Sequence, residues 1–142
     1  EAVAPCGLRC DNCLAFQGGE IHQHAKALQE LLGSNFSGYA ERLGRMNPVF
    51  KNYPGFRDVL AFLAVGSCGG CRSGGCIFEG CRIPDCSKEH DVDYCFQCSE
   101  FPCNKSGFPL DLEARWKRNN EKMRDLGVEA YFELIKDKPR YP

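Results

Sequence analysis

Cysteine is the residue that most limits how this 142-residue chain can fold, because the chain carries 11 of them. Eight lie between Cys68 and Cys103, in groups only a few residues apart. Thiolates two residues apart can turn back onto one ion, and zinc sites and iron–sulfur clusters both use this geometry. The sequence therefore predicts metal binding. The candidate ligands are Cys6, Cys10, Cys13, Cys68, Cys71, Cys76, Cys81, Cys86, Cys95, Cys98 and Cys103.

The charged residues are balanced, with 18 Lys and Arg against 19 Asp and Glu. This balance gives no bulk electrostatic reason to expect binding to nucleic acid or to an anionic membrane. The longest apolar stretch, 59–65, is too short to cross a bilayer. We therefore expect no membrane partner and do not favour nucleic acid, while a protein partner remains open.

The compartment is inferred from the thiols. An odd number of cysteines cannot close entirely into disulfides within one chain, and no signal peptide is visible before Cys6. Secreted disulfide scaffolds also tend to be shorter and to lack amphipathic helices. The sequence therefore predicts reduced, metal-bound cysteines in a cytoplasmic protein.

The length is that of a single small domain, 1–142, with a modest core. Four segments follow one another: a cysteine knuckle (1–19), a helical segment (20–65), a cysteine-rich metal module (66–107) and C-terminal helices (108–142). Glycine and proline leave the third segment room only for short β elements or single turns. The predicted fold is mainly α with an irregular cysteine-rich module.

Apolar periodicity predicts three helices before the module. The first has apolar residues at Ile21, Ala25, Leu28 and Leu32 and should end at Gly33. A weaker helix covers 38–45. The third begins after Pro54-Gly55, ends at Gly66 and is expected to bury Phe56, Val59, Leu60 and Leu63.

Two further helices are predicted after the module. The first places Leu112, Trp116, Met123 and Leu126 on one face and ends at Gly127. The second carries Val128, Tyr131, Phe132 and Ile135. This region also contains basic residues beside Trp116, namely Arg115, Lys117, Arg118, Lys122 and Arg124. Interspersed acidic residues favour an exposed face of mixed charge over a nucleic-acid site.

The strongest chemical signal is a pair of CxxC motifs. Cys68 and Cys71 form the first, and Cys95 and Cys98 form the second. This spacing is compatible with one zinc-ribbon-like site of four thiolates. The alternative, a redox dithiol at Cys68 and Cys71, is disfavoured because such motifs normally start a helix beside a sheet.

The remaining module cysteines, Cys76, Cys81, Cys86 and Cys103, could form a second site interleaved with the first. Spacing does not decide which thiols share an ion, and Cys10 or Cys13 could instead belong with Cys103. His90 could replace one thiolate, although a solvated histidine is the simpler interpretation, as it is for His22 and His24.

Cys6, Cys10 and Cys13 have the CxxxCxxC spacing of radical S-adenosylmethionine enzymes. Those enzymes need a barrel of repeated βα units, which this chain does not offer, so we reject that interpretation. Three thiolates could hold zinc with an open fourth position, or a ligand from the module could close the site. Closure makes the site structural and is the simpler alternative.

The motifs together resemble a known family. They are the CGLRCxxC start at Cys6, the CxGC step at Cys68, the CRIxxC segment at Cys81 and the CxxCxxFPC ending at Cys95. This framework is similar to the prokaryotic domain-of-unknown-function family number 3795, whose members are thought to bind zinc. Cys76 departs from it, since the next cysteine follows sooner in relatives. The resemblance implies a prokaryotic cytoplasmic protein and supplies no activity.

We therefore expect a protein that holds two or three zinc ions, mainly for structure, and that acts as a binding or adaptor module. A catalytic role is not favoured, because closed four-thiolate sites have no position left for a substrate. The alternative is a redox or metal-transfer protein with an iron–sulfur cluster or zinc at Cys6, Cys10 and Cys13. Nucleic-acid binding is a weaker alternative.

Overall fold

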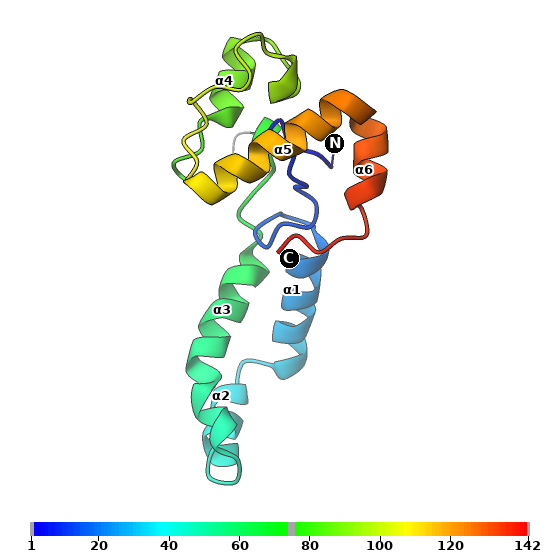
Figure 1. Cartoon of the computed structure of the whole chain (residues 1–142). Coiled ribbons are helices and arrows are strands. Elements are labelled where there is room, and N and C mark those ends of the chain that lie inside the picture. Colours follow the sequence, from blue (N-terminus) through cyan, green and yellow to red (C-terminus); the bar gives the residue numbers. More distant parts are fainter. Residues whose placement is uncertain (1, 74–75, 142) are drawn as a thin grey trace. The chain divides into compact units, whose positions relative to one another are not determined.

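Helices make up nearly all the regular structure of residues 2–73 and 76–141, which the computed structural model describes (Figure 1). The α-helices are α1 (Glu20–Leu32), α2 (Phe36–Leu43), α3 (Tyr53–Val65), α4 (Ile83–Glu89), α5 (Leu110–Leu126) and α6 (Val128–Ile135), and the 3-10 helices are η1 (Pro48–Asn52), η2 (Cys71–Ser73) and η3 (Cys95–Gln97). Extended pairing in the described residues includes an isolated antiparallel bridge, Val3 with Arg9. The mainly α fold with an irregular cysteine-rich module is confirmed. None of these helices combines the length and apolar character needed to cross a membrane.

The chain divides into two compact units, which are described separately. Unit 1 consists of Glu1–Asn12 and Cys68–Pro142, and unit 2 is Cys13–Ser67. Unit 1 is therefore built from two stretches of chain that the whole of unit 2 separates in the sequence. The boundary falls inside the predicted knuckle, 1–19, and places Cys13 with the helices. The number of domains stays a prediction.

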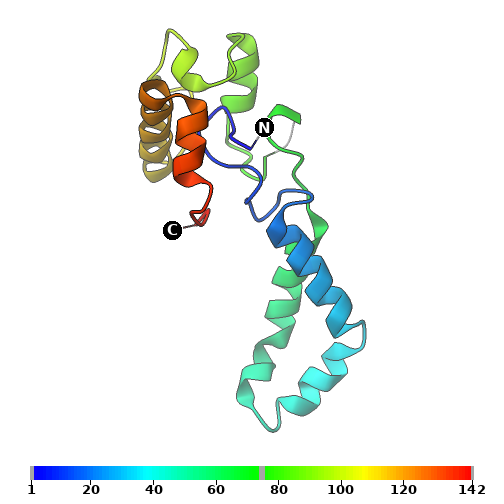
Figure 2. The ribbon, with the colours of Figure 1, turned by 90° about the vertical axis from the view of Figure 1, so that its right-hand side faces the viewer.

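Unit 2 is built on the pairing of α1 with α3, which lie side by side in both views (Figure 2). Ala25 of α1 and Leu60 of α3 are its buried residues within the two helices. The predicted helix ends at Gly33 and Gly66 are confirmed, and both glycines have positive φ. A Cβ at Gly66 would lie 2.8 Å from the His22 ring, so this close approach also requires glycine.

The predicted buried stripe of α3 is partly wrong. Leu60 is buried, but Phe56 and Val59 are 47% and 59% exposed, and Leu28 of α1 is also exposed. The reason is that α3 is apolar around most of its circumference, while α1 covers only one side of it. Periodicity identified the helix but could not say how much of its apolar surface has a partner.

The core of unit 1 lies against α5, which packs beside α6. Trp116 and Met123 are almost completely buried, as predicted, whereas Leu126 is exposed because it is the last residue of α5. Asn120, which the apolar pattern missed, completes the buried face between them. Its side-chain amide donates to the Trp116 carbonyl, and its oxygen accepts the Phe96 N–H at 3.0 Å.

The N-terminal segment is fixed to the last two helices at Gly7. The Tyr131 hydroxyl donates to the Gly7 carbonyl at 2.7 Å, and the Asn119 amide donates to the same oxygen at 3.1 Å. Gly7 has φ +78°, and a Cβ there would lie 2.7 Å from Asn119 Cβ. These contacts hold the loop that carries Cys6 and Cys10 against α5 and α6.

Candidate metal centre

A short hairpin positions the first two cysteines of unit 1. The Ala4 N–H donates to the Leu8 carbonyl at 2.8 Å, and the Cys10 N–H donates to the Ala2 carbonyl at 2.8 Å. These bonds turn the backbone at Cys6 and bring Cys10 back beside the start of the chain. The remaining thiols of unit 1 come from the irregular module and from the turns around η2, α4 and η3.

Four thiols from this hairpin and the module form what we call the first thiol group: Cys10, Cys71, Cys76 and Cys81. Side-chain hydrogen bonds connect Cys71 to both Cys10 and Cys76, and a further one connects Cys76 to Cys81. The group therefore joins a cysteine of the N-terminal hairpin to three cysteines that unit 2 separates from it in the sequence.

The hydrogen bonds divide the first thiol group into donors and acceptors. The bond from Cys71 lowers the pKa of Cys10 to about 6. Bonds from Cys71 and Cys81 likewise lower the pKa of Cys76. The same bonds, followed by burial, raise the pKa of Cys71 and of Cys81. Cys71 and Cys81 are therefore the donors of these bonds, and Cys10 and Cys76 are the acceptors.

Backbone amides are directed at the sulfur atoms as well. The recurring pattern is an N–H donated from the second residue after the cysteine: Leu8 to Cys6, Gly70 to Cys68, Phe78 to Cys76 and Ile83 to Cys81. The Cys71 N–H also donates to Cys10. Such amide bonds stabilise negative charge on sulfur and orient it, as outer-shell partners do for metal ligands.

Two further groups influence the first thiol group. Cys6 is buried, which raises its pKa to about 11. The Arg140 guanidinium acts in the other direction, because its positive charge lowers the pKa of Cys6, Cys10 and Cys76. Arg140 Nη1 is buried and has no hydrogen-bond partner within the described part of the chain. A buried, unpaired donor of this kind is favoured beside sulfur atoms that carry charge.

The second thiol group consists of Cys86, Cys95, Cys98 and Cys103, all of which line one small cavity of about 20 Å³. His90 and the indole of Trp116 also line it. A cavity needs about 10–15 Å³ to admit one water molecule, so this one has room for a single small occupant. Four thiols and a histidine around such a space are a donor set suited to zinc.

Burial is the main influence on two members of the second thiol group. It raises the pKa of Cys95 to about 12, and the Trp116 indole N–H opposes this by approaching the Cys95 sulfur without the geometry of a full hydrogen bond. Burial also raises the pKa of Cys86, and the nearby Cys103 and Cys98 raise it further. Without a cation, these sulfur atoms favour the protonated form.

The structure groups the thiols differently from the CxxC spacing. Spacing paired Cys71 with Cys95 and Cys98, but Cys71 bonds to members of the first thiol group, and Cys95 and Cys98 belong to the second. Cys68 is buried and accepts the Gly70 N–H. Cys13 lies in unit 2.

The structure does not itself show a metal site. All eleven cysteines are present as thiols. Across residues 2–73 and 76–141, no three side chains of His, Cys, Asp or Glu already stand in an arrangement that would hold an ion.

The basic residues of α5 are largely engaged within the protein. Lys117 pairs with Glu113 at 2.7 Å, Arg115 donates to the Arg140 carbonyl, and Arg124 pairs with Asp125 at 3.4 Å. Trp116, the aromatic residue beside them, is buried in the core. The helix therefore presents no free cluster of basic and aromatic side chains at these positions.

Comparison with known proteins gives one match. Residues 2–107 match the model of a family described as "Protein of unknown function (DUF3795)". This range includes every cysteine and ends before α5. No curated protein and no solved structure matches the chain.

Proposed function

The chain belongs to the DUF3795 family, and we propose that it is a zinc-stabilised binding module. In this proposal the first thiol group, Cys10, Cys71, Cys76 and Cys81, holds one zinc ion. The second, Cys86, Cys95, Cys98 and Cys103, holds another. Both ions serve the fold, and the surfaces that they support bind a protein partner in the reducing cytoplasm.

The hydrogen-bonded contact of the first thiol group carries this proposal. Thiols joined by hydrogen bonds lie near one another, and thiolate is the form that binds metal, so a cation that replaces the bridging protons would draw the four sulfur atoms into one site. Zinc is favoured because it accepts four thiolates without any redox change. Amide N–H groups and the Arg140 charge would offset part of the negative charge of such a site.

The small cavity of the second thiol group supports a second ion. Burial opposes charge on Cys95 and Cys86, so their thiolates need a cation beside them. Zinc bound there would connect α4, η3 and the segment that carries Cys103 beside Trp116. His90 lies on the same cavity and could replace one of the four sulfur ligands.

A binding role is favoured over catalysis because four-thiolate sites are closed to substrates. Exposed apolar side chains such as Leu31, Phe62 and Val65 in unit 2 support a protein as the partner, since apolar surface is commonly found at interfaces. The thiols support a compartment that keeps cysteine reduced.

The number of zinc ions bound by three variants tests which cysteines share an ion. We expect Cys71→Ser and Cys98→Ser each to lose one zinc ion per chain, and the double variant to lose both, as measured by elemental analysis of purified protein. If the two residues shared one ion, as their CxxC spacing suggested, the double variant would lose no more zinc than either single variant.

The same preparation distinguishes zinc from an iron–sulfur cluster. We expect colourless protein with zinc in a fixed ratio to chain. Brown protein purified without oxygen, with visible absorption and equal amounts of iron and sulfide, would overturn the zinc assignment. That result would favour a redox role for the same thiols.

A further inference from the structure

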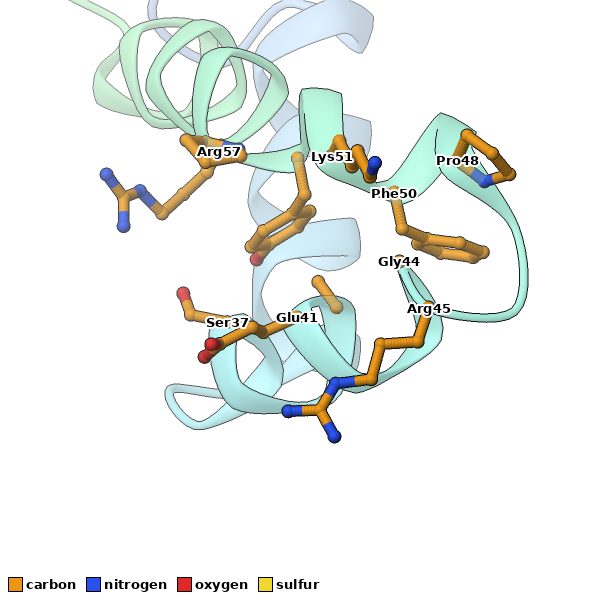
Figure 3. A pocket seen from close by; sticks show the side chains of 11 residues that line it. Ser37, Glu41, Gly44, Arg45, Pro48, Phe50, Lys51 and Arg57 are labelled. Atoms are coloured by element: carbon orange, nitrogen blue, oxygen red, sulfur yellow. The ribbon is translucent and has the colours of Figure 1, made fainter.

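Unit 2 contains a pocket of about 730 Å³ that is independent of the thiols (Figure 3). Ser37, Glu41 and Arg45 line it from α2 and the turn that follows, and Pro48, Phe50, Lys51 and Arg57 line it from η1 and the start of α3. The volume lies in the range of about 300–1,000 Å³ that small-molecule sites occupy. All the lining residues belong to one unit, so its own fold forms the pocket.

The turn between α2 and η1 gives the pocket a fixed backbone. The Asn47 N–H donates to the Leu43 carbonyl at 2.8 Å, and the Asn47 side chain accepts the Val49 N–H at 3.1 Å. Gly44 is buried in this turn, where a Cβ would lie 3.3 Å from the Glu41 carbonyl and 3.7 Å from Lys51 Cγ. Lys51 therefore packs its aliphatic stem closely beside Gly44.

Positive charge predominates around the pocket. Its lining contains Arg45, Lys51 and Arg57 against a single carboxylate, Glu41. Arg57 pairs with its neighbour Asp58 at 3.0 Å, but neither Arg45 nor Lys51 forms a salt bridge with any described residue. Two unpaired cations on one concave surface favour a negatively charged ligand.

The same pocket has an aromatic and aliphatic wall. Phe50 and Tyr53 line it together with Pro48 and Pro54. The Tyr53 ring packs edge-on against Phe36 with ring centroids 5.1 Å apart, which restricts its movement. A ligand that fills this space would therefore place an apolar or planar part against these rings and its charged group toward Arg45 and Lys51.

We propose that this pocket binds a small organic anion, with a carboxylate or phosphate group attached to a planar or apolar body. Lys51 and Arg45, on opposite sides of the pocket, supply the positive charge that attracts the anionic group, and Phe50 and Tyr53 contact the body. Glu41 adds one negative charge at the edge and so weakens the binding of highly charged anions. The site lies outside the thiol groups, so it does not depend on the proposed role of zinc.

Titration of the full-length protein with four probes tests the ligand class. Phenyl phosphate and benzoate carry both a ring and a charge, inorganic phosphate carries only charge, and benzyl alcohol carries only the ring. We expect saturable amide shifts at Gly44 and Lys51, measured by NMR, with phenyl phosphate or benzoate. The tighter of these two identifies the anionic group. Inorganic phosphate and benzyl alcohol should bind at least about tenfold more weakly, since each lacks one set of contacts.

Charge variants then test the residues. Lys51→Met and Arg45→Met should each weaken binding of the tighter probe about tenfold, the size expected for one charge-assisted hydrogen bond. Lys51→Arg should restore most of it, and Glu41→Gln should strengthen phenyl phosphate binding. Lys26 is an exposed residue of α1 that does not line the pocket, so Lys26→Met is the matched control. It should change affinity less than about twofold.

Three results would overturn the proposal. The first is benzyl alcohol binding as tightly as benzoate, which would show that charge is not recognised. The second is unchanged affinity in Lys51→Met with helix content preserved by circular dichroism. The third is an absence of saturable shifts in unit 2 with all four probes at millimolar concentration. Loss of zinc in the cysteine variants affects none of these readouts, provided that unit 2 keeps its helices.

Discussion

Unit 1 and unit 2 differ in their cysteine content and in the regularity of their backbone. Ten of the 11 cysteines lie in unit 1, where the described residues of 68–73 and 76–107 form short helices and loops. Unit 2 contains one cysteine, Cys13, and consists of helices that pack on one another. We therefore expect the loops of unit 1 to depend on their cysteine side chains for order, and unit 2 to depend on helix formation and packing.

The difference also appears in where apolar side chains lie. In unit 1, Trp116 and Met123 are almost fully buried, and thiols pack against the core cluster that contains Trp116. In unit 2, large side chains such as Phe56 and Val59 of α3 are about half exposed. Unit 1 thus buries its largest side chains more completely than unit 2 does.

Metal removal should produce the largest difference between the two units. When a chelator removes zinc, we expect unit 1 to lose its amide protection, while α1 and α3 of unit 2 keep theirs. Each structural zinc contributes about 10–16 kcal/mol to folding, which is comparable with the whole stability of a small domain. Hydrogen exchange measured peptide by peptide by mass spectrometry would show this.

The control is the same protein with zinc added back, which should regain protection at Cys71 and Cys95. Equal loss of protection in both units would show that unit 2 folds only together with unit 1. Unchanged protection in unit 1 would show that its thiols need no metal to order the backbone.

A core substitution should have the next largest effect. Trp116 is 1% exposed and packs edge-on against Phe101 and Phe108, with ring centroids 5.2 and 6.5 Å away. Trp116→Ala should reduce the free energy of unfolding by about 3–5 kcal/mol, because it leaves a large cavity. Urea unfolding followed by far-ultraviolet circular dichroism measures the change. A loss below about 1 kcal/mol would contradict the packing described for unit 1.

Substitution of Arg140 tests how strongly metal binding in unit 1 depends on positive charge near its thiols. Arg140→Met should weaken zinc binding by the first thiol group about tenfold, as loss of an outer-shell partner commonly does. Arg140→Lys, which keeps the charge, should recover part of the affinity. Competition with a chromophoric chelator measures both variants.

The second thiol group provides the internal reference for Arg140, because the main causes that raise the pKa of Cys86 and of Cys95 are burial and neighbouring thiols and do not include Arg140. Its zinc affinity should stay the same in both variants. An equal loss at the two groups would indicate a general loosening of unit 1 and would contradict a local electrostatic role.

The smallest effect is expected in unit 2. Phe56 of α3 is 47% exposed, so Phe56→Ala removes only part of the apolar burial of a phenylalanine. We expect the free energy of unfolding to fall by about 1 kcal/mol, measured by urea unfolding as for Trp116. A loss of 3 kcal/mol or more would show that another surface covers Phe56 in solution.

The helices could be predicted from the sequence because their signals are local. Gly33, Gly66 and Gly127 each end a helix where the apolar pattern stops, and each has positive φ. Neighbouring residues alone produce these boundaries, so a single sequence is enough to find them. The cysteine framework was likewise sufficient to identify the family.

The grouping of the thiols could not be predicted in the same way. Cys10 and Cys71 are joined by a hydrogen bond although all of unit 2 lies between them in the sequence. Spacing rules compare cysteines that are close along the chain, so they paired Cys71 with Cys95 and Cys98. The sequence pattern did not indicate a role for Arg140, because it lies in the C-terminal tail, far along the chain from the thiols. It did not indicate a role for Asn120 either, because this is a polar residue on an apolar helix face.

The discontinuous course of unit 1 has a consequence for protein synthesis. A ribosome adds about 5–20 residues per second, so Cys10 leaves it several seconds before Cys71 does. During that interval unit 2 can already form its helices, whereas the cysteines that contact Cys10 in the folded protein have not yet been translated. The first thiol group can therefore be completed only after Cys81 emerges from the ribosome. Until then, Cys6 and Cys10 have to stay reduced in the nascent chain.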